Sequence, residues 1–384
     1  MRKKKIITIV GARPQIIKAS AISRAVALFF ADQIDEVIVH TGQHYDQNMS
    51  QIFFEELGIP NPSHNINVGS GRHGKQTAKM IDGIEQILLE EKPDAVLLYG
   101  DTNSTIAGAI AAAKIHIPVI HIEAGLRSFN KKMPEEINRI SCDHMSSLLF
   151  SPTLQGIENL KKEGFNTNID GKATMDTPHI YHCGDVMLDN SMHFSKQATN
   201  DEKLLEKLNL SPQHYILCTI HRDNNTDISS HLKNILLALI DCQKETKMKI
   251  VLPLHPRTKC KIEQLEDQGF LVHEIVNNPN ILILPPAGFK DIITLEKNSR
   301  LIITDSGGLQ KEAYFFKKPC VILREQTEWV EIVNNGNAIL TGADYDKIKK
   351  ALHTLLNKTD FTYPELFGDG LAGKFICSKI LSDL

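Results

Sequence analysis

Short apolar segments typical of β-strands alternate along this chain with longer segments of helical periodicity. This alternation predicts βαβ units with a parallel sheet, and few other folds accommodate it. In the first half the strand-like segments are Lys5–Val10, Glu36–His40, Ala95–Tyr99, Val119–Ile122 and Leu148–Ser151. The helical segments that follow them are Ile16–Phe30, Met49–Leu57, Gly74–Glu91, Ser104–Lys114 and Glu135–Met145.

The same alternation starts again in the second half. We therefore predict an α/β protein with two doubly wound, Rossmann-like domains, over residues 1–184 and 185–365, and a closing helix within 366–384. A cleft between the carboxyl ends of the two sheets would be the ligand site. The strand-like segments are Tyr215–Thr219, Lys249–Leu254, Ile281–Leu284, Leu301–Thr304 and Cys320–Leu323. The helical segments are His231–Lys244, Ile292–Lys297 and Leu309–Phe315.

The composition argues against several classes of protein. A net charge of −3 does not suit bulk electrostatic binding of nucleic acid. The seven cysteines are odd in number and form no CxxC pair, which indicates reduced thiols rather than disulfides or a zinc site. The apolar run before Gly11 is only about five residues long, and no later run approaches about 18. We therefore expect a cytoplasmic protein that does not span a membrane.

The first predicted strand leads into a turn that could bind phosphate. Gly11 begins the turn, Arg13 lies on it, and Lys18 follows one helical turn later. The pattern is not the GxGxxG of dinucleotide-binding folds, but a helix N-terminus with two cations suits a phosphate group. The alternative is that both cations are ordinary surface charges.

Three carboxylates of the first half converge on one predicted sheet edge. Asp101 and Glu123 each follow a buried strand, and Glu135 opens a helix after a proline. Taken alone, Asp101 could cap a helix and Glu135 could be a solvated acid of a first turn. A buried Glu123 needs either a partner such as Arg127 or a role in a site. Their convergence favours a site.

The second half carries a matching pair of motifs. His221 and an arginine follow its first predicted strand. Ser306-Gly307-Gly308 lies between a strand and a helix, where small residues let backbone N–H groups approach phosphate oxygens. Glu312 is placed to receive ribose hydroxyls. The alternatives are a structural histidine and a capped tight turn. The sequence has no HxH or HExxH pattern, so we predict no metal site.

Together the motifs GARPQxIK, HTGQH, GDTNS, HIEAGLRS, PEEINR, TDSGGLQKEA and RxxTEW resemble the UDP-N-acetylglucosamine 2-epimerase family, in family order from Gly11 to about Glu331. The resemblance implies the glycosyltransferase-B architecture, with a C-terminal helix that returns to the first domain. It also implies a reaction without NAD or metal. The enzyme would remove the proton at carbon 2, expel UDP to give a 2-acetamidoglycal, and add UDP back with a proton on the opposite face. The product would be a precursor for surface polysaccharide.

The resemblance assigns roles residue by residue. It implies catalytic roles for Asp101, Glu123, Glu135 and His221. It implies substrate binding by Arg13, Lys18, Arg139, Ile292, Ser306, Gly307, Gly308, Glu312 and Arg324. In some members a second, activating UDP-sugar binds at positions that correspond to Gln43, His44, Arg72 and His255.

The chain departs from the family pattern at a few positions. Ala12 and Gln15 stand where Thr and Glu are common, and Trp329 stands where many epimerases have arginine. These variants resemble the branch that acts on UDP-2,3-diacetamido-2,3-dideoxyglucuronate. The sugar carboxylate would need a further cation, for which we consider Arg222, Arg127 and Lys131. The family's uracil-stacking aromatic falls at Ile292, with Phe289 close by.

Three other functions remain open from the sequence. A hydrolysing epimerase would release N-acetylmannosamine and UDP after the same elimination. A UDP-sugar glycosyltransferase could use the same architecture, although three acids in the first half disfavour it. A non-catalytic UDP-sugar sensor would have lost the acids or His221, and all of them are present. We expect a homodimer, as is common in the family.

Overall fold

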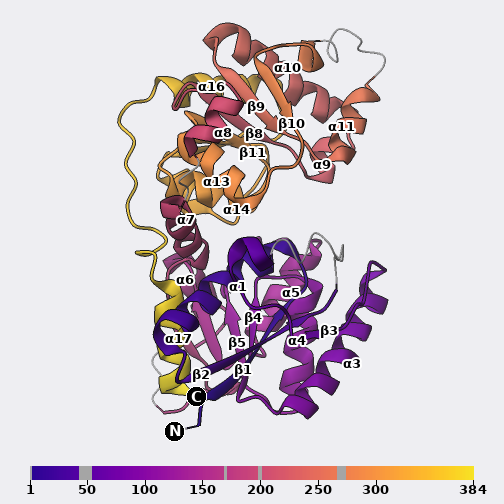
Figure 1. Cartoon of the computed structure of the whole chain (residues 1–384), viewed down its shortest axis with the longest axis vertical. Helices are drawn as coiled ribbons and strands as arrows, with labels where there is room; N and C mark the ends of the chain where they lie inside the picture. Colours follow the sequence, from indigo (N-terminus) through magenta and orange to yellow (C-terminus); the bar gives the residue numbers. More distant parts are fainter. Residues whose placement is uncertain (1, 43–53, 168–170, 198–200, 266–273) are drawn as a thin grey trace. The chain divides into compact units, whose positions relative to one another are not determined.

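The computed structural model describes residues 2–42, 54–167, 171–197, 201–265 and 274–384 (Figure 1). The chain divides into two compact units. Unit 1 consists of Met1–Asn190 and Glu365–Leu384, and unit 2 of Ser191–Pro364. The first division lies within helix α7 (Val186–Gln197), a few residues after the boundary expected from the sequence.

Unit 1 is built on a seven-stranded sheet in the order β3-β2-β1-β4-β5-β6-β7, in which every pairing is parallel. The predicted parallel sheet is thus confirmed for this unit. The strands are β1 (Lys4–Val10), β2 (Ile34–His40), β3 (His64–Asn65), β4 (Ala95–Tyr99), β5 (Val119–Ile122), β6 (Leu148–Ser151) and β7 (His179–His182).

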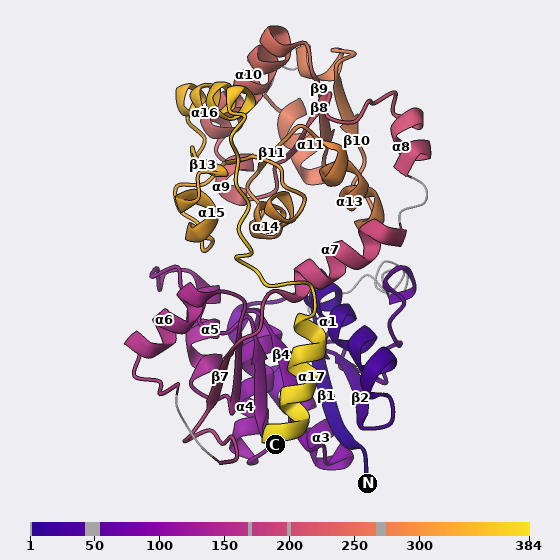
Figure 2. The ribbon, with the colours of Figure 1, turned by 90° about the vertical axis from the view of Figure 1, so that its left-hand side faces the viewer.

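Helices cover both faces of this sheet, as Figures 1 and 2 show. Alternate residues of β1, Ile7 and Ile9, are fully buried against α3 and α4, because successive strand side chains point to opposite faces. Helices α1 and α17 pack together on the other face. The helices are α1 (Arg13–Ala25), the π-helix η1 (Val26–Phe30), α3 (His73–Glu91), α4 (Asn103–Lys114), α5 (Pro134–Asp143), α6 (Leu154–Lys162) and α17 (Ala372–Asp383).

Unit 2 contains a six-stranded parallel sheet in the order β10-β9-β8-β11-β12-β13. Helices α10 and α16 cover one face and share its apolar core, and α13 and α14 lie on the other (Figure 2). The strands are β8 (Tyr215–Thr219), β9 (Lys249–Pro253), β10 (Ile281–Leu284), β11 (Leu301–Thr304), β12 (Cys320–Ile322) and β13 (Ala338–Leu340). The helices are α8 (Asp201–Lys207), α9 (Asp223–Thr226), α10 (Ser229–Thr246), α11 (Pro256–Glu263), α13 (Phe289–Asn298), α14 (Gly307–Phe315), α15 (Val330–Asn334) and α16 (Tyr345–Asn357).

The sequence prediction missed one edge strand of each sheet. Strands β3 and β13 contain two and three residues, too few to give a periodic apolar pattern. Most of the helix predicted over Met49–Leu57 lies outside the described residues. None of the helices in the described ranges combines the length and the apolar character that a bilayer span requires.

Candidate active site

The strand order of each sheet marks where ligands bind. In open α/β sheets the binding crevice lies beyond the carboxyl ends of the strands, where the order reverses. The reversal falls between β1 and β4 in unit 1, and between β8 and β11 in unit 2. All four strands run directly into motifs singled out in the sequence.

The turn after β1 is held by Gln15, a fully buried residue of α1. Its Oε1 accepts hydrogen bonds from the N–H groups of Gly11 and Ala12, at 2.9 and 3.2 Å. Its Nε2 donates to the carbonyl of Tyr99 at 3.0 Å. A side chain at Gly11 would lie 2.1 Å from Ser104 Oγ, so only glycine fits. Gln15 thus ties the turn after β1 to the turn after β4. Arg13, the first residue of α1, is exposed beside it.

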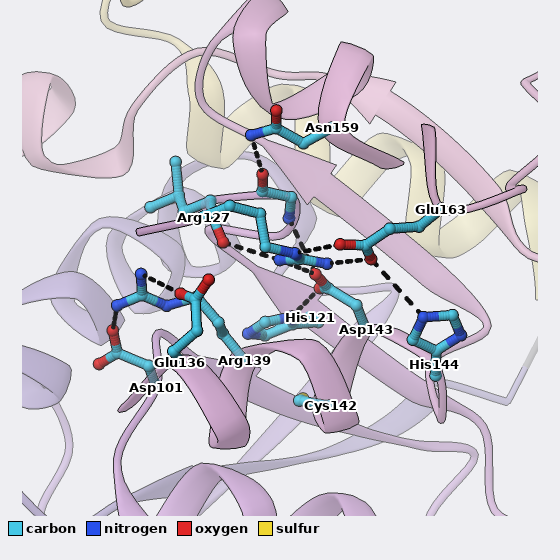
Figure 3. Close-up of polar contacts among 12 residues, drawn as sticks. Asp101, His121, Arg127, Glu136, Arg139, Cys142, Asp143, His144, Asn159 and Glu163 are labelled. Carbon is cyan, nitrogen blue, oxygen red and sulfur yellow. Dashed lines mark hydrogen bonds and ion pairs between the residues drawn. The ribbon is translucent and has the colours of Figure 1, made fainter. Parts of the chain in front are cut away.

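The turn after β4 presents Asp101 in an ion pair with Arg139 of α5 (Figure 3). Arg139 also pairs with Glu136, which lies one helical turn earlier, with 3.1 Å between Nη1 of the arginine and Oε2 of the glutamate. Glu136 is buried and accepts the N–H groups of Ser128 and Phe129 at 2.9 and 2.8 Å. Asp101 is therefore oriented by a cation that is itself fixed. Its side chain remains 31% exposed, as a group that meets a substrate must be.

Glu123 lies beyond β5 and forms an ion pair with Lys18 of α1. The ammonium of Lys18 and the carboxylate of Glu123 both lie close to Gly100. A Cβ atom added at Gly100 would be 3.2 Å from Lys18 Nζ and 3.4 Å from Glu123 Oε2. Glu123 has a positive φ of 71°, an uncommon backbone conformation that tends to persist at functional sites. We call Asp101, Glu123, Lys18 and Arg139 the acid site.

Of the two alternatives considered for Glu123, a pairing with Arg127 is not found, because Glu123 pairs with Lys18. The Arg127 side chain is fully buried in ion pairs with Asp143 and Glu163. This burial also removes Arg127 as a cation for a sugar carboxylate.

Glu135 is exposed on the first turn of α5, whereas its neighbour Glu136 faces inward. Lys131 is exposed on the preceding loop.

In unit 2, Asp305 holds together the two strand ends at the reversal point. Its carboxylate accepts the N–H groups of His221 and Arg222 at 3.0 Å, and the Asn225 side chain at the same distance. Burial alone would raise the pKa of Asp305, but these hydrogen bonds outweigh it and the pKa is lowered. The His221 ring lies 3.8 Å from Asp305 and is 48% exposed. His221 is therefore fixed by its backbone, with its ring available.

Ser306, Gly307 and Gly308 form the phosphate loop, our name for this turn from β11 into α14. Ser306 is the N-cap of α14, and its Oγ accepts from Leu309 N at 3.5 Å. A side chain at Gly307 would lie 3.7 Å from Trp329 Nε1 and 3.8 Å from Arg324 Nη1. An indole N–H and a guanidinium thus adjoin a helix N-terminus, which favours an anion.

The residues around the phosphate loop are themselves fixed. Arg324 pairs with both oxygens of Glu328, at 2.9 and 3.0 Å. Lys311 is 2% exposed and places its ammonium 4.2 Å from the centre of the Trp329 ring, a cation–π contact. Trp329 thus has a packing role and an N–H beside the loop.

Glu312 is buried on α14 near a second carboxyl group, Glu296 of α13. Burial and the proximity of Glu312 raise the pKa of Glu296 well above its usual value. Burial disfavours the charged form of a carboxyl group, and the nearby Glu312 disfavours it further, so the folded state favours a proton on Glu296.

Ile292, Phe289, His255 and Arg72 lie within the described residues but take no part in the contacts given above. Ile292 is half-buried on α13, and Phe289 is buried edge-on against Phe194 with ring centres 5.3 Å apart, which leaves Phe289 unsuited to stack on a base. His255 and Arg72 are exposed at the N-caps of α11 and α3. Gln43 and His44 lie outside the described residues.

Sequence reasoning missed three residues that organise the candidate site. Glu136 and Asp305 stand next to residues that were singled out, but their inward orientation depends on contacts with loops, nearby in sequence for Glu136 and distant for Asp305. His121 stands in the HIEAGLRS motif, two residues before Glu123. It is buried on β5, and its role could not be read from the motif. A polar residue inside an otherwise apolar strand was the available sign.

A family model described as UDP-N-acetylglucosamine 2-epimerase matches residues 28–381. The UDP-2,3-diacetamido-2,3-dideoxy-D-glucuronate 2-epimerase of Pseudomonas aeruginosa is 48% identical over 376 residues, which cover 98% of this chain and 99% of the relative. A UDP-N-acetylglucosamine 2-epimerase homolog of Methanococcus maripaludis is also 48% identical, over 95% of this chain and 96% of its own length.

Solved structures are similar over the same extent. The Methanocaldococcus jannaschii UDP-GlcNAc 2-epimerase, crystallised with UDP-GlcNAc and UDP, gives a TM-score of 0.85 at 42% identity and covers 98% of this chain and 99% of that chain. A protein from Listeria monocytogenes gives a TM-score of 0.87 at 27% identity, over 100% of this chain and 97% of that chain. The two parallel-sheet units thus have the glycosyltransferase-B-like fold of these neighbours.

Proposed function

Since the chain belongs to the UDP-N-acetylglucosamine 2-epimerase family, we propose that it inverts carbon 2 of a UDP-linked N-acetylated amino sugar without net hydrolysis. The chain is accordingly an isomerase that acts on a carbohydrate. The observation that carries the proposal is the acid site, in which Asp101 and Glu123 stand at the ends of neighbouring strands, each paired with a cation.

The chemistry requires what the acid site supplies. The proton at carbon 2 is barely acidic, so its loss must accompany departure of UDP from carbon 1. The proton passes to an enzyme carboxylate, its bonding electrons form the C1–C2 double bond, and the C1–O bond to UDP breaks. Re-addition reverses these changes and delivers a proton to the opposite face of carbon 2. Two or more positioned carboxylates meet that demand, and we assign it to Asp101, Glu123 and Glu135.

The charge that develops on UDP needs stabilisation when the C1–O bond breaks. We assign this to the phosphate loop, Arg324 and His221, which together offer a helix N-terminus, a guanidinium and an imidazole. Glu312 would receive the ribose hydroxyls. Arg13 would hold phosphate or sugar.

Reaction in D₂O separates this proposal from its alternatives. The protein is incubated with UDP-N-acetylglucosamine or the diacetamido-uronate analogue, and the products are followed by NMR. Deuterium at carbon 2 of a sugar that still carries UDP is expected. Free sugar with UDP would indicate the hydrolysing reaction. No exchange with either sugar would overturn the epimerase assignment and favour a transferase or a sensor.

We propose the diacetamido-uronate as the preferred substrate and a homodimer as the assembly. Identity of 48% to the Pseudomonas aeruginosa enzyme supports the substrate, as do Gln15 and Trp329. A higher kcat/KM for the uronate than for UDP-N-acetylglucosamine is expected, and the reverse order would overturn the preference. Light scattering checks the assembly, because a homodimer would have twice the monomer mass of 43.0 kDa.

A further inference from the structure

Next to the turns that bear Asp101 and Glu123 lies a group of four buried or half-buried charged residues that the reaction does not use directly. Figure 3 shows this group together with Asp101 and Arg139. The four residues are His121 of β5, Arg127 of the following loop, Asp143 of α5 and Glu163 at the end of α6. The side chains of His121, Arg127 and Asp143 are fully buried, and that of Glu163 is 27% exposed. We call these four residues the charged network.

His121 has a hydrogen-bond acceptor on each ring nitrogen. Nδ1 lies 2.7 Å from Asp143 Oδ1, and Nε2 lies 2.8 Å from the carbonyl oxygen of Gly100. A neutral imidazole carries only one N–H and would leave one acceptor facing a lone pair. Asp143 is held as a carboxylate because its other oxygen pairs with Arg127 and accepts the N–H of Gly125. Both contacts of the ring are then satisfied when both nitrogens carry protons, as in the imidazolium form.

The electrostatics of the network agree with this form. Burial by itself would lower the pKa of His121, but Cys142 and Asp143 outweigh it and raise the pKa well above its usual value. Burial would raise the pKa of Asp143, yet His121 and Arg127 lower it. Two cations and two carboxylates give the network no net charge, which is how a buried charge is tolerated.

Asp143 carries the connection from His121 to the turn that bears Glu123. Its second oxygen accepts the N–H of Gly125 at 3.1 Å and pairs with Arg127 at 2.7 Å. On the far side, Arg127 is held by Glu163 through two bonds of 2.6 Å. The carboxylate of Asp143 therefore has no freedom to turn away from His121.

The two backbone groups that the network grips adjoin the two carboxylates of the acid site. Gly100 precedes Asp101 and has a φ of 63°, and Gly125 follows Glu123 by two residues with a φ of 78°. We propose that His121, as an imidazolium, is a positioning residue that with Asp143 locks the turn bearing Asp101 onto the turn bearing Glu123. The proposal rests on the proposed function, because it assigns the network to the geometry of those two carboxylates.

The first test uses His121→Gln and Asp143→Asn in the full-length protein. Loss of the lock is expected to lower kcat by about 10²-fold, the effect of a misplacement of about 1 Å at reacting groups. KM should change little, and UDP should bind as before because the phosphate loop is in unit 2. The double variant should be no worse than either single one, since the two residues act as one device.

The control is His179→Gln, which breaks a His–Asp pair of the same kind in the same unit. His179 of β7 contacts Asp383 at 3.0 Å, and both side chains are mostly buried, at 10% and 11% exposure. This variant should lose stability and keep kcat near the wild-type value. If His121→Gln kept a wild-type kcat, or if the two network substitutions multiplied in the double variant, the positioning role would be overturned.

A second measurement needs no substrate. Long-range proton–nitrogen NMR of the ¹⁵N-histidine protein, with the His121 signals assigned from His121→Gln, is expected to show protons on both ring nitrogens at about pH 8.5. A neutral ring there would overturn the imidazolium. An inactive wild type with a protonated His121 ring would instead sink the proposed function, so the two failures are distinguishable.

Discussion

At the scale of single residues, the candidate site consists of charged groups that hold one another in place. Asp101 is oriented by Arg139, and Arg139 by Glu136. Glu123 is held by Lys18 on a strained backbone. Asp101 thus depends on a cation whose own position is fixed, and Glu123 depends on the cation beside it. This arrangement predicts that conservative substitutions at the site will cost turnover more than folding.

Asp101→Asn should keep the shape of the side chain and remove its ability to take or return a proton. Turnover is expected to fall by about 10²- to 10⁴-fold, the usual contribution of a general acid or base. UDP affinity, measured by calorimetry, should be preserved. Near-normal turnover would remove Asp101 from the mechanism.

Glu296→Gln tests whether Glu296 of α13 holds a proton in the folded protein. The raised pKa of Glu296 means that its protonated form is favoured in the folded state, so its contribution to stability is full below the unfolded pKa of about 4.5 and is lost as pH rises. Glutamine mimics the protonated acid and cannot ionise. The variant should therefore gain Tm over wild type, and gain more at about pH 8.5 than at about pH 5.5.

The control for this change is Glu263→Gln, an exposed glutamate on α11. It should show the same small difference from wild type at both pH values. A gain for Glu296→Gln that did not depend on pH would contradict a proton held by Glu296 in the folded protein.

Single residues also show where sequence reasoning reached its limit. Asp101, Glu123 and the phosphate loop were found because they directly follow apolar strands. Glu135 and Glu136 are adjacent acids on one helix turn, and nothing in the pattern tells which one faces inward. Contacts with Ser128 and Phe129 decide it. The same holds for Arg127, whose partners lie well beyond it in the sequence.

At the scale of elements, the site depends on close approaches between turns and helices. The turn after β5 touches α6 so closely that a side chain at Gly125 would lie 2.3 Å from the carbonyl oxygen of Gly156. Strands long enough to show an apolar pattern were predicted correctly, whereas these contacts between elements were not. They depend on backbone geometry, which periodicity does not encode.

Gly125→Ala should destabilise the protein through both its positive φ and this contact. We expect a loss of at least about 2 kcal/mol in the free energy of unfolding, measured by denaturant titration. Gly164→Ala isolates the backbone effect, because Gly164 has a φ of 94° and nothing within 4 Å of its added carbon. Equal losses for the two variants would show that the contact with α6 is unimportant.

At the scale of the whole molecule, unit 1 is formed from two separate pieces of chain. Its last helix, α17, packs on α1, where a side chain at Gly373 would lie 2.9 Å from the carbonyl oxygen of Ala21. Asp189 accepts the N–H groups of Ala372 and Gly373 at 3.1 and 2.8 Å and so caps this helix.

Gly373→Val should therefore loosen unit 1 and spare unit 2. Hydrogen exchange followed by mass spectrometry is expected to become faster in β1 and α1, with β8 and β11 unchanged. Ser378→Ala, on the exposed side of the same helix, should leave both units as they are. Faster exchange spread evenly over both sheets would contradict a local docking role for α17.

The two pieces of unit 1 also set an order of events on the ribosome. Residues Met1–Asn190 emerge first, but the α1 surface that α17 covers stays open until residues 365–384 have been made. Unit 2 is one continuous piece between them and can complete its sheet earlier. While unit 2 folds, the α1 surface of unit 1 therefore remains without the cover that α17 later provides. The unit that carries the acid site is therefore completed only when residues 365–384 have been made.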